Sequence, residues 1–352
     1  MNIPVLKKDF LGGSKDRIGF LKDVIKCKVT EERHGAFFLE MTYKNIGDIV
    51  SEIKVGRIIE AFASVELGKQ HFRIYDIKKD IKGNINISAE HITADLKKMY
   101  VYEGKLKDKT VLEILNEVLF TRNVCEPCHF SASSEFSNTI SVNYTFQSVL
   151  ECFYGRESSL VDVLGGNVEV IRDNNSLKVN KSRGKERKNT LQYRKNISDF
   201  ICIENKDHAY THLFPYVIHE NGNMQGLDRK YTTIVKYSLK IRDHEGESYN
   251  VLEKDFTSDP FWDKNTITKD NLLKLSNNYI KKLKKTPRFK YEIKISDVML
   301  KKEEDLKNVG LCDTFKLNND LYNISMKVKV VELTVDSLTG LPLNIILEEI
   351  PN

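Results

Sequence analysis

The chain has 352 residues, of which 40% are hydrophobic and 30% charged, with only 7 Pro and 18 Gly. This is the composition of a soluble globular protein, and it excludes a collagen-like fibre or a disordered chain. The 55 Lys and Arg residues against 50 Asp and Glu give a net charge of +5, weaker than the bias of a dedicated nucleic-acid-binding protein.

The length favours two to four domains over a single core. Residues Met1–Phe10 lack the apolar centre of a signal peptide, because Lys7, Lys8 and Asp9 interrupt it. No apolar run reaches the roughly 20 residues that a membrane-spanning helix needs. We therefore expect synthesis in the cytoplasm and no membrane insertion.

Residues 1–92 are predicted to be mostly β. The centre of this part is Gln70–Leu96, in which two alternating strands flank a Lys82-Gly83-Asn84 turn and a helix begins near Thr93. Further strands are expected from short apolar runs: Ile18–Leu21 paired with Cys27–Val29, Ala36–Met41, and Gly56–Phe62. Many short strands with Gly and Asn turns favour a small barrel or sandwich.

Residues 93–196 change to an α/β pattern. Thr110–Phe120 is predicted to be a helix, because its apolar residues recur at i, i+3, i+4 and i+7 and Thr110 can cap its start. Helices are also expected over Phe146–Cys152 and Ser158–Leu164, the second ending at Gly165-Gly166. A hairpin of Val168–Ile171 and Leu177–Val179 follows.

Residues 197–255 return to a β pattern, with strands expected at Ile197–Glu204, His212–Val217 and Tyr231–Ile241. A helix from Lys269 to Lys285 should end before Pro287. The last block is again β, with expected strands at Phe289–Ile295, Thr314–Leu317, Tyr322–Val335 and Leu343–Glu349.

The last block repeats the pattern of the first. Phe72–Asp80 aligns with Val328–Asp336, and in both cases a Gly-containing turn and another apolar strand follow. Each also has a short apolar strand before it, Arg57–Phe62 and Asp313–Leu317. These observations predict two related small β-barrels.

The cysteines offer one tempting spacing. Cys125-Glu126-Pro127-Cys128 has the form of a redox pair or half a zinc site, but there is no second CxxC and no βαβ context. The other cysteines show no disulfide framework: Cys27, Cys152, Cys202 and Cys312. We expect free thiols and no bound metal, because Cys152, Cys202, His208 and His212 would complete a site only by coincidence of folding.

Other catalytic patterns are weak. Ser182-Arg183-Gly184-Lys185 matches SxxK in form only, and no GxSxG, HExxH or phosphate-binding loop is present. His91 is expected to be structural, its imidazole fixing the corner between a strand and a helix by hydrogen bonds. The sequence therefore predicts no catalytic residue, no cofactor-binding residue and no metal ligand.

The order of the motifs carries a resemblance. Phe72–Leu96 (FRIYDIKKD…INISAEHITADL), the Gly165-Gly166 hairpin, Arg183-Gly184 and the terminal β block resemble the prophage endopeptidase tail family, also called the phage minor structural or tail-associated protein family. The similarity extends from about Ile18 to Glu349. One departure is Cys312-Asp313, where the family usually has Gly-Asp, and it bears on the geometry of that turn.

The resemblance implies an α+β, mainly β fold like that of a phage baseplate hub, with two small related β-barrels, an α/β insertion and a helical segment. The implied divisions are a first barrel at 1–92, an α/β insertion at 93–196, a β segment returning to the first barrel at 197–255, a helical connection at 256–288 and a second barrel at 289–352.

The resemblance also implies a function. Members form the hub at the tip of a long tail, in a virion, prophage or phage-derived bacteriocin. The implied partners are two further copies in a homotrimer, the tail tube and distal tail proteins, the tape measure protein, and spike or receptor-binding proteins. Phage DNA would pass through the channel without specific binding. Because the chain ends where the hub ends, we expect no attached enzyme.

Two other functions stay open from the sequence. The chain could be a tail-associated endopeptidase that degrades peptidoglycan, in which case substituting a Cys or His would abolish activity on cell wall. It could also be a module that binds a host-surface glycan, which binding of the isolated chain to a glycan array would indicate.

Overall fold

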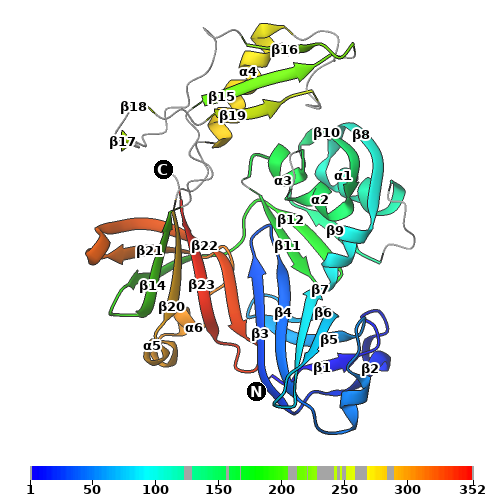
Figure 1. Ribbon diagram of the computed structural model, residues 1–352, viewed down its shortest axis with the longest axis vertical. Helices are drawn as coiled ribbons and strands as arrows, with labels where there is room; N and C mark the ends of the chain where they lie inside the picture. The colour runs from blue at the N-terminus through cyan, green and yellow to red at the C-terminus, as the bar shows by residue number, and fades with distance from the viewer. Residues whose placement is uncertain are drawn as a thin grey trace.

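The computed structural model describes residues 2–122, 129–155, 158–166, 168–204, 212–219, 221–227, 242–243, 246–247, 251–257, 268–283 and 289–350. Strands dominate, and most helices are short (Figure 1). The predicted α+β, mainly β fold class is thereby confirmed.

The first β unit comprises strands β1 to β7 and packs around one hydrophobic core. Its strands are β1 (Val5–Lys7), β2 (Arg17–Phe20), β3 (Val24–Glu32), β4 (Phe37–Lys44), β5 (Ile58–Ser64), β6 (Gly68–Lys79) and β7 (Asn84–His91). Short 3-10 helices accompany them: η1 (Gly13–Asp16), η2 (Asp48–Glu52) and η3 (Ile92–Lys98). The strand order is β3-β4-β7-β6-β5-β1-β2.

One expected pairing in this unit is wrong. The sequence paired the strand at Ile18–Leu21 with the one at Cys27–Val29, whereas β2 pairs with β1 and β3 pairs with β4. The reason is Leu21, which is fully buried and donates its amide hydrogen to the carbonyl of Pro4, so the chain turns away from a hairpin at this point.

The second β unit packs around a separate core. Its strands are β13 (Glu186–Gln192), β14 (Ile197–Glu204), β20 (Phe289–Ile295), β21 (Thr314–Asn319), β22 (Ile324–Asp336) and β23 (Pro342–Glu349). The helices α5 (Asp297–Lys302) and α6 (Glu304–Lys307) and the 3-10 helix η6 (Asp320–Tyr322) lie between them in the chain. The strand order is β14-β20-β23-β22-β21-β13.

The two units share one topology. Ordered from β3 in the first and from β14 in the second, the strands correspond as β3-β4-β7-β6-β5-β1 to β14-β20-β23-β22-β21-β13. The terminal pairs differ, since β1 is antiparallel to β5 while β13 is parallel to β21. In both units the strands at the two ends of the path are chain neighbours, β2 and β3 in one and β13 and β14 in the other, so each sheet curls around its core.

Pairing between β3 and β22 joins the units into one sheet of 13 described strands, with a seam of five residue pairs from Glu332–Glu32 to Asp336–Lys28. The sequence did not predict this seam. The resemblance implied that 197–255 returns to the first barrel, whereas β14, at the start of that segment, pairs with β20 of the second unit. An alternating strand pattern does not identify the partner strand, which explains the difference.

The insertion lies between the units in the chain and packs on the first one (Figure 1). Its elements are β8 (Tyr100–Thr110), α1 (Val111–Asn116), the π-helix η4 (Glu117–Thr121), β9 (Ser131–Ser134), β10 (Thr139–Ser148), α2 (Val149–Phe153), α3 (Leu160–Val163), β11 (Glu169–Asp173) and β12 (Ser176–Asn180). Thr110 caps α1 as predicted, with the reciprocal bond from Glu113. The helix expected from Phe146 begins only at Val149, because Ser148 caps it and Phe146 has φ +47°.

A further group contains β15 (His212–Ile218), β16 (Met224–Gly226), β19 (Val251–Asp255) and α4 (Lys269–Leu283), with the short strands β17 (Arg242–Asp243) and β18 (Gly246–Glu247) forming a pair. Leu272 and Ile280 of α4 are buried against this small sheet. The strand expected at Tyr231–Ile241 lies outside the described residues. None of the described helices has the length and apolar character needed to cross a bilayer.

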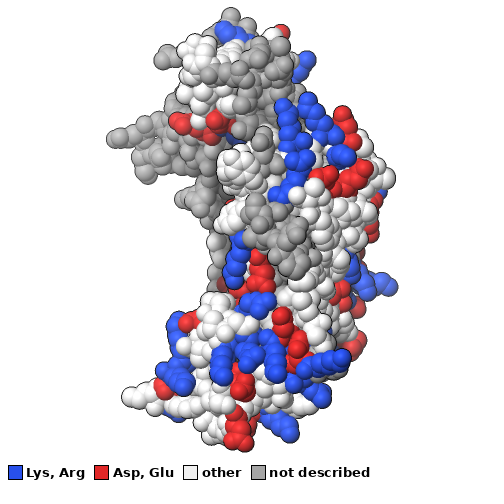
Figure 2. Space-filling view, turned by 90° about the vertical axis from the view of Figure 1, so that its right-hand side faces the viewer, with Lys and Arg blue, Asp and Glu red and all other residues white. Residues whose placement is uncertain are grey.

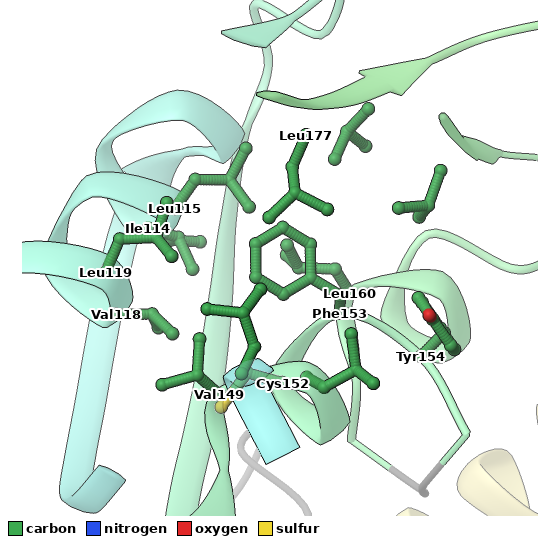
Figure 3. Packing of buried hydrophobic residues seen from close by; sticks show 14 of the residues in the cluster. Ile114, Leu115, Val118, Leu119, Val149, Cys152, Phe153, Tyr154, Leu160 and Leu177 are labelled. Carbon is green, nitrogen blue, oxygen red and sulfur yellow. The ribbon is translucent and has the colours of Figure 1, made fainter. Parts of the chain in front are cut away.

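The core of the insertion generates a stability prediction. Phe153 is fully buried, and Figure 3 shows its ring surrounded by apolar side chains from α1, α3 and β12. Phe153→Ala should lower the free energy of unfolding by about 3–5 kcal/mol, since it leaves a cavity in a packed core. Phe120→Ala is the control, because Phe120 is 48% exposed and its removal should have a small effect. Chemical denaturation measures both, and equal losses would contradict this description of the core.

Candidate functional site

Charged side chains are concentrated where β11 and the turn before β13 meet both β units. We call this group the junction, and its residues are Glu31, Arg33, Glu169, Arg172, Arg183 and Asp313. All but Arg33 are less than a tenth exposed. Buried ions require partners, so the junction dictates how the three parts of the chain fit together.

Arg183 is the strongest link of the junction. Its guanidinium donates to both carboxylate oxygens of Glu31 at 2.9 Å and to Glu66 at 3.0 and 3.2 Å. Burial alone would lower the pKa of Arg183, but the charges and hydrogen bonds of Glu31 and Glu66 outweigh it and raise that pKa. The paired geometry with Glu31 fixes both distance and orientation between the turn and β3.

The next residue in the chain is Gly184, and only glycine fits at this position. Its φ is +81°, and a Cβ would lie 2.2 Å from the carbonyl carbon of Cys312. Across this close approach, the amide of Lys185 donates to Asp313 at 2.7 Å and the amide of Thr314 donates to the Lys185 carbonyl. The Arg183-Gly184 motif therefore holds the turn against the first and second units at once.

The departure at Cys312 keeps the turn. Cys312 has φ +68°, a left-handed conformation that glycine adopts without cost and other residues rarely adopt. Its thiol is buried and lies 3.3 Å from the Glu169 carboxylate. Packing of this side chain offsets the cost of the left-handed backbone conformation.

Glu169 connects the insertion to both units. Its carboxylate accepts from Arg33 of the first unit at 2.8 Å and from Lys329 of the second at 3.3 Å. Burial would raise the pKa of Glu169, but the hydrogen bond and charge of Arg33, with Lys329 and His34, outweigh it and lower that pKa. The carboxylate is therefore held ionised between cations of different units.

Arg172 satisfies the backbone of the turn between β3 and β4. It donates to the carbonyls of Gly35 at 2.6 Å and Glu32 at 2.8 Å, and to the Tyr154 hydroxyl at 3.1 Å. Its guanidinium also lies 5.0 Å from the centre of the Phe37 ring. The Glu32 carbonyl also accepts from the amide of Gly35, so Arg172 adds a charged donor to a half-buried turn.

His91 makes the hydrogen bonds that the sequence predicted. Its Nδ1 lies 2.8 Å from Thr93 Oγ1 and caps η3, while Nε2 lies 3.1 Å from Gln70. The amide of Asn174, in the β11–β12 hairpin, donates to the same Gln70 side chain. His91 thus also anchors the insertion hairpin to β6, and burial lowers its pKa well below the usual range.

At the rim of the seam lies a polar pocket of about 120 Å³, lined by Glu32, Arg33, Lys290, Val331, Glu332, Ile346 and Glu348. Glu332 and Glu32 face each other across the seam. Burial raises the pKa of Glu332, and the nearby charges of Glu32 and Glu292 raise it further. Like charges directly opposite each other destabilise a strand pair.

The cysteine and SxxK candidates are not brought into a site. Cys125, Cys128 and His208 lie outside the described residues, and the side chain of His212 is not described. Cys152 is buried beside Gln147, whereas Cys202 is exposed on β14. Of the SxxK residues, Arg183 belongs to the junction, and Gly184 forms the turn that follows it.

In the part of the chain that the structure describes, no three His, Cys, Asp or Glu side chains gather as metal ligands would. The residues that sequence reasoning missed are Glu31, Glu169 and Arg172. Each is a charged residue within a strand, but Glu31 is followed by Glu32 and Arg172 by Asp173. Only Glu169, which stands between Val168 and Val170, carries a sequence signal of burial.

The fold and the junction define a protein of two β units that an insertion holds together. Comparisons with known proteins find this architecture elsewhere. Residues 185–343 match the family described as Prophage endopeptidase tail. A search of curated protein sequences found no significant match.

Solved structures of tail proteins share the fold. The prophage MuSo2 43 kDa tail protein from Shewanella oneidensis has a TM-score of 0.62 at 14% identity, over 98% of both chains. A tail protein from Neisseria meningitidis has 0.59 at 10% identity, over 99% of this chain and 96% of its own. The prophage tail protein gp18 from Listeria monocytogenes has 0.58 at 14% identity, over 99% and 94%. The predicted resemblance to phage tail proteins is confirmed.

The junction yields a prediction about Arg183. Glu31→Ala should lower the free energy of unfolding by about 3–5 kcal/mol, because it leaves a buried guanidinium without its main partner. Glu66→Ala is the matched control: Glu66 binds the same guanidinium but its side chain is 37% exposed, so the loss should stay within about 1 kcal/mol. Urea denaturation compares them, and a larger loss for Glu66→Ala would contradict this ranking.

The seam yields a prediction about pH. Since the folded state raises the pKa of Glu332, the ionised carboxylate costs stability above that pKa and none below it. Glu332→Gln should therefore be more stable than wild type by roughly 0.2–1 kcal/mol at pH 7. The gain should vanish as the pH falls below about 4. Glu40→Gln is the control, because Glu40 faces Lys28 and should gain nothing. Thermal unfolding of the variants as a function of pH measures this gain. A gain in stability that increases as the pH falls would contradict the raised pKa of Glu332.

Proposed function

We propose that the protein is a structural hub at the tip of a long phage tail, in a virion or a phage-derived bacteriocin particle. Three copies form a ring that connects the six-fold tail tube to a three-fold tip. The observation that carries this is the duplication: two units of one topology in one chain give six similar units in a trimer.

The ring closes through heterologous contacts. The first unit of one chain meets the second unit of its neighbour, and three such contacts return to the start. One face of the ring then repeats six times, as a tube of six subunits requires, while features present once per chain repeat three times. The tail tube, distal tail and tape measure proteins bind the former face.

In this proposal, the β units and the insertion have different roles. The first β unit (β1 to β7) and the second β unit (β13, β14 and β20 to β23) form the adaptor, and the insertion (β8 to β12) with the region around α4 builds the tip that carries spike or receptor-binding proteins. The insertion exposes an aromatic pair suited to such contacts: Tyr102 and Phe146 are 62% and 64% exposed, with ring centres 4.6 Å apart. Phe146 is held at φ +47°, a conformation rare for bulky residues.

The arrangement of the charged side chains supports a structural role rather than an enzymatic one. The buried charges of the junction are engaged with one another across units and leave little for a substrate. On the face drawn in Figure 2, described basic and acidic side chains are intermixed over the lower half of the molecule. A surface of mixed charge supports protein contacts, because the described residues on this half of the face lack the single-sign patch that binding to a nucleic-acid backbone uses.

Copy number in the assembled tail tip tests the proposal. We expect three copies in a closed ring around an open channel, as seen by cryo-electron microscopy of intact tails and by quantitative mass spectrometry against the tube protein. The isolated chain can remain monomeric at low concentration, since closure needs the tube as a template. Six copies, or single copies bound at the periphery, would refute the adaptor role.

A further inference from the structure

The seam within the chain shows how two units of this fold join. Antiparallel β3 and β22 exchange main-chain hydrogen bonds, and beyond the ends of the paired residues the Arg33 amide donates to Val331 and the Ser337 amide to Cys27. The seam uses the second half of β22, because β21 pairs only with residues 324–329. β3, an outer strand of the first unit, thus pairs with the half of β22 that β21 leaves unpaired in the second unit.

The duplication can be followed residue by residue. The β6–β7 pair is bulged between Ile74 and Asp76, and the β22–β23 pair is bulged between Val330 and Glu332. Similarly, β3–β4 is bulged after Val24 and β14–β20 after Ile197. With these bulges superposed, residues 76–80 correspond to 332–336 and residues 27–31 correspond to 200–204.

This correspondence identifies two free edges. β14 corresponds to β3 and the second half of β6 corresponds to the second half of β22. Within the described residues, Ile197 at the start of β14 bridges to Tyr193, but residues 200–204 pair only with β20. On the β5 side of β6, the main-chain hydrogen bonds of the described residues end at Ile74. Both edges expose apolar side chains: Ile201 is 47% and Ile203 42% exposed on β14, and Tyr75 is 56% exposed on β6. In the described part of the chain, the two strands that would form a second seam therefore lack a partner on that side.

We propose that β14 of one chain pairs antiparallel with the second half of β6 in the neighbouring chain and repeats the internal seam between chains. The register follows from the internal seam: Cys202 faces Lys79 and Ile203 faces Lys78 of the neighbour. The inference rests on the proposed trimer and names the strands that close it. A ring of six units then alternates between seams within chains and seams between chains.

The side chains on these edges favour this pairing over its alternatives. Lys78 and Lys79 are exposed, and lysines on an edge strand oppose pairing of two copies of that edge with each other. β14 has apolar Ile201 and Ile203 instead, over which lysine stems can lie. The contact is therefore heterologous, as a closed three-fold ring requires.

A disulfide tests the register. Facing residues of antiparallel strands have Cα atoms about 4.5–5.5 Å apart, within the range that a disulfide spans. In tail particles assembled with the full-length Lys79→Cys variant, diamide should oxidise the introduced thiol and the native Cys202 thiol to a disulfide. A non-reducing gel should then show the hub as a covalent trimer. The double variant Cys202→Ser, Lys79→Cys should give none. Lys69→Cys is the matched control, on the half of β6 that pairs with β5.

A second measurement uses wild-type particles, in case the variant does not assemble. A short amine-to-thiol reagent should join Lys78 or Lys79 to Cys202, with the linked peptides found by mass spectrometry in trimers. Three-copy rings without either linkage, or with an equal yield of disulfide in the Lys69→Cys control, overturn this seam and leave the proposed function intact. A copy number other than three overturns the proposed function itself.

Discussion

The buried ion pair between Arg183 and Glu31 is the interaction on which the arrangement depends. Arg183 belongs to the turn that enters the second unit, and Glu31 lies on β3 within the seam, so one contact sets the register and the distance between the halves. A buried ion pair adds little net stability compared with apolar packing, but it is costly to misalign. We therefore attribute specificity, rather than strength, to the junction.

The insertion also contributes polar contacts that join the two β units. Arg172 supplies donors to carbonyls at the end of β3, and Glu169 places one carboxylate between cations from both units. Neither β unit provides these groups itself. The insertion thus completes the polar interior of the seam and holds the two units together.

Much of the fold could be predicted from the sequence, because alternating and helical periodicities report local structure. The repeat, the Thr110 cap, the Gly165-Gly166 stop and the role of His91 followed from such patterns. The pairing of β14 with β20, the β1–β2 pair and the seam could not, because strand partners are chosen by contacts distant in sequence. The junction was hidden for a related reason: Glu31 and Arg172 have charged neighbours in the sequence and resemble solvated positions until the tertiary structure buries them.

Duplication also leads to an order of assembly. In the internal seam, Leu338 follows β22 and is buried in the core of the first unit, and Thr30 and Thr334 share a hydrogen bond of 2.9 Å. The residue that corresponds to Leu338 in the first unit is Lys82, which is exposed. A seam between chains would therefore lack this apolar anchor. In the ring that we propose, seams within chains would form with folding, whereas the weaker seams between chains would form only on a template that holds three chains together. Premature polymerisation through free edges would thereby be avoided.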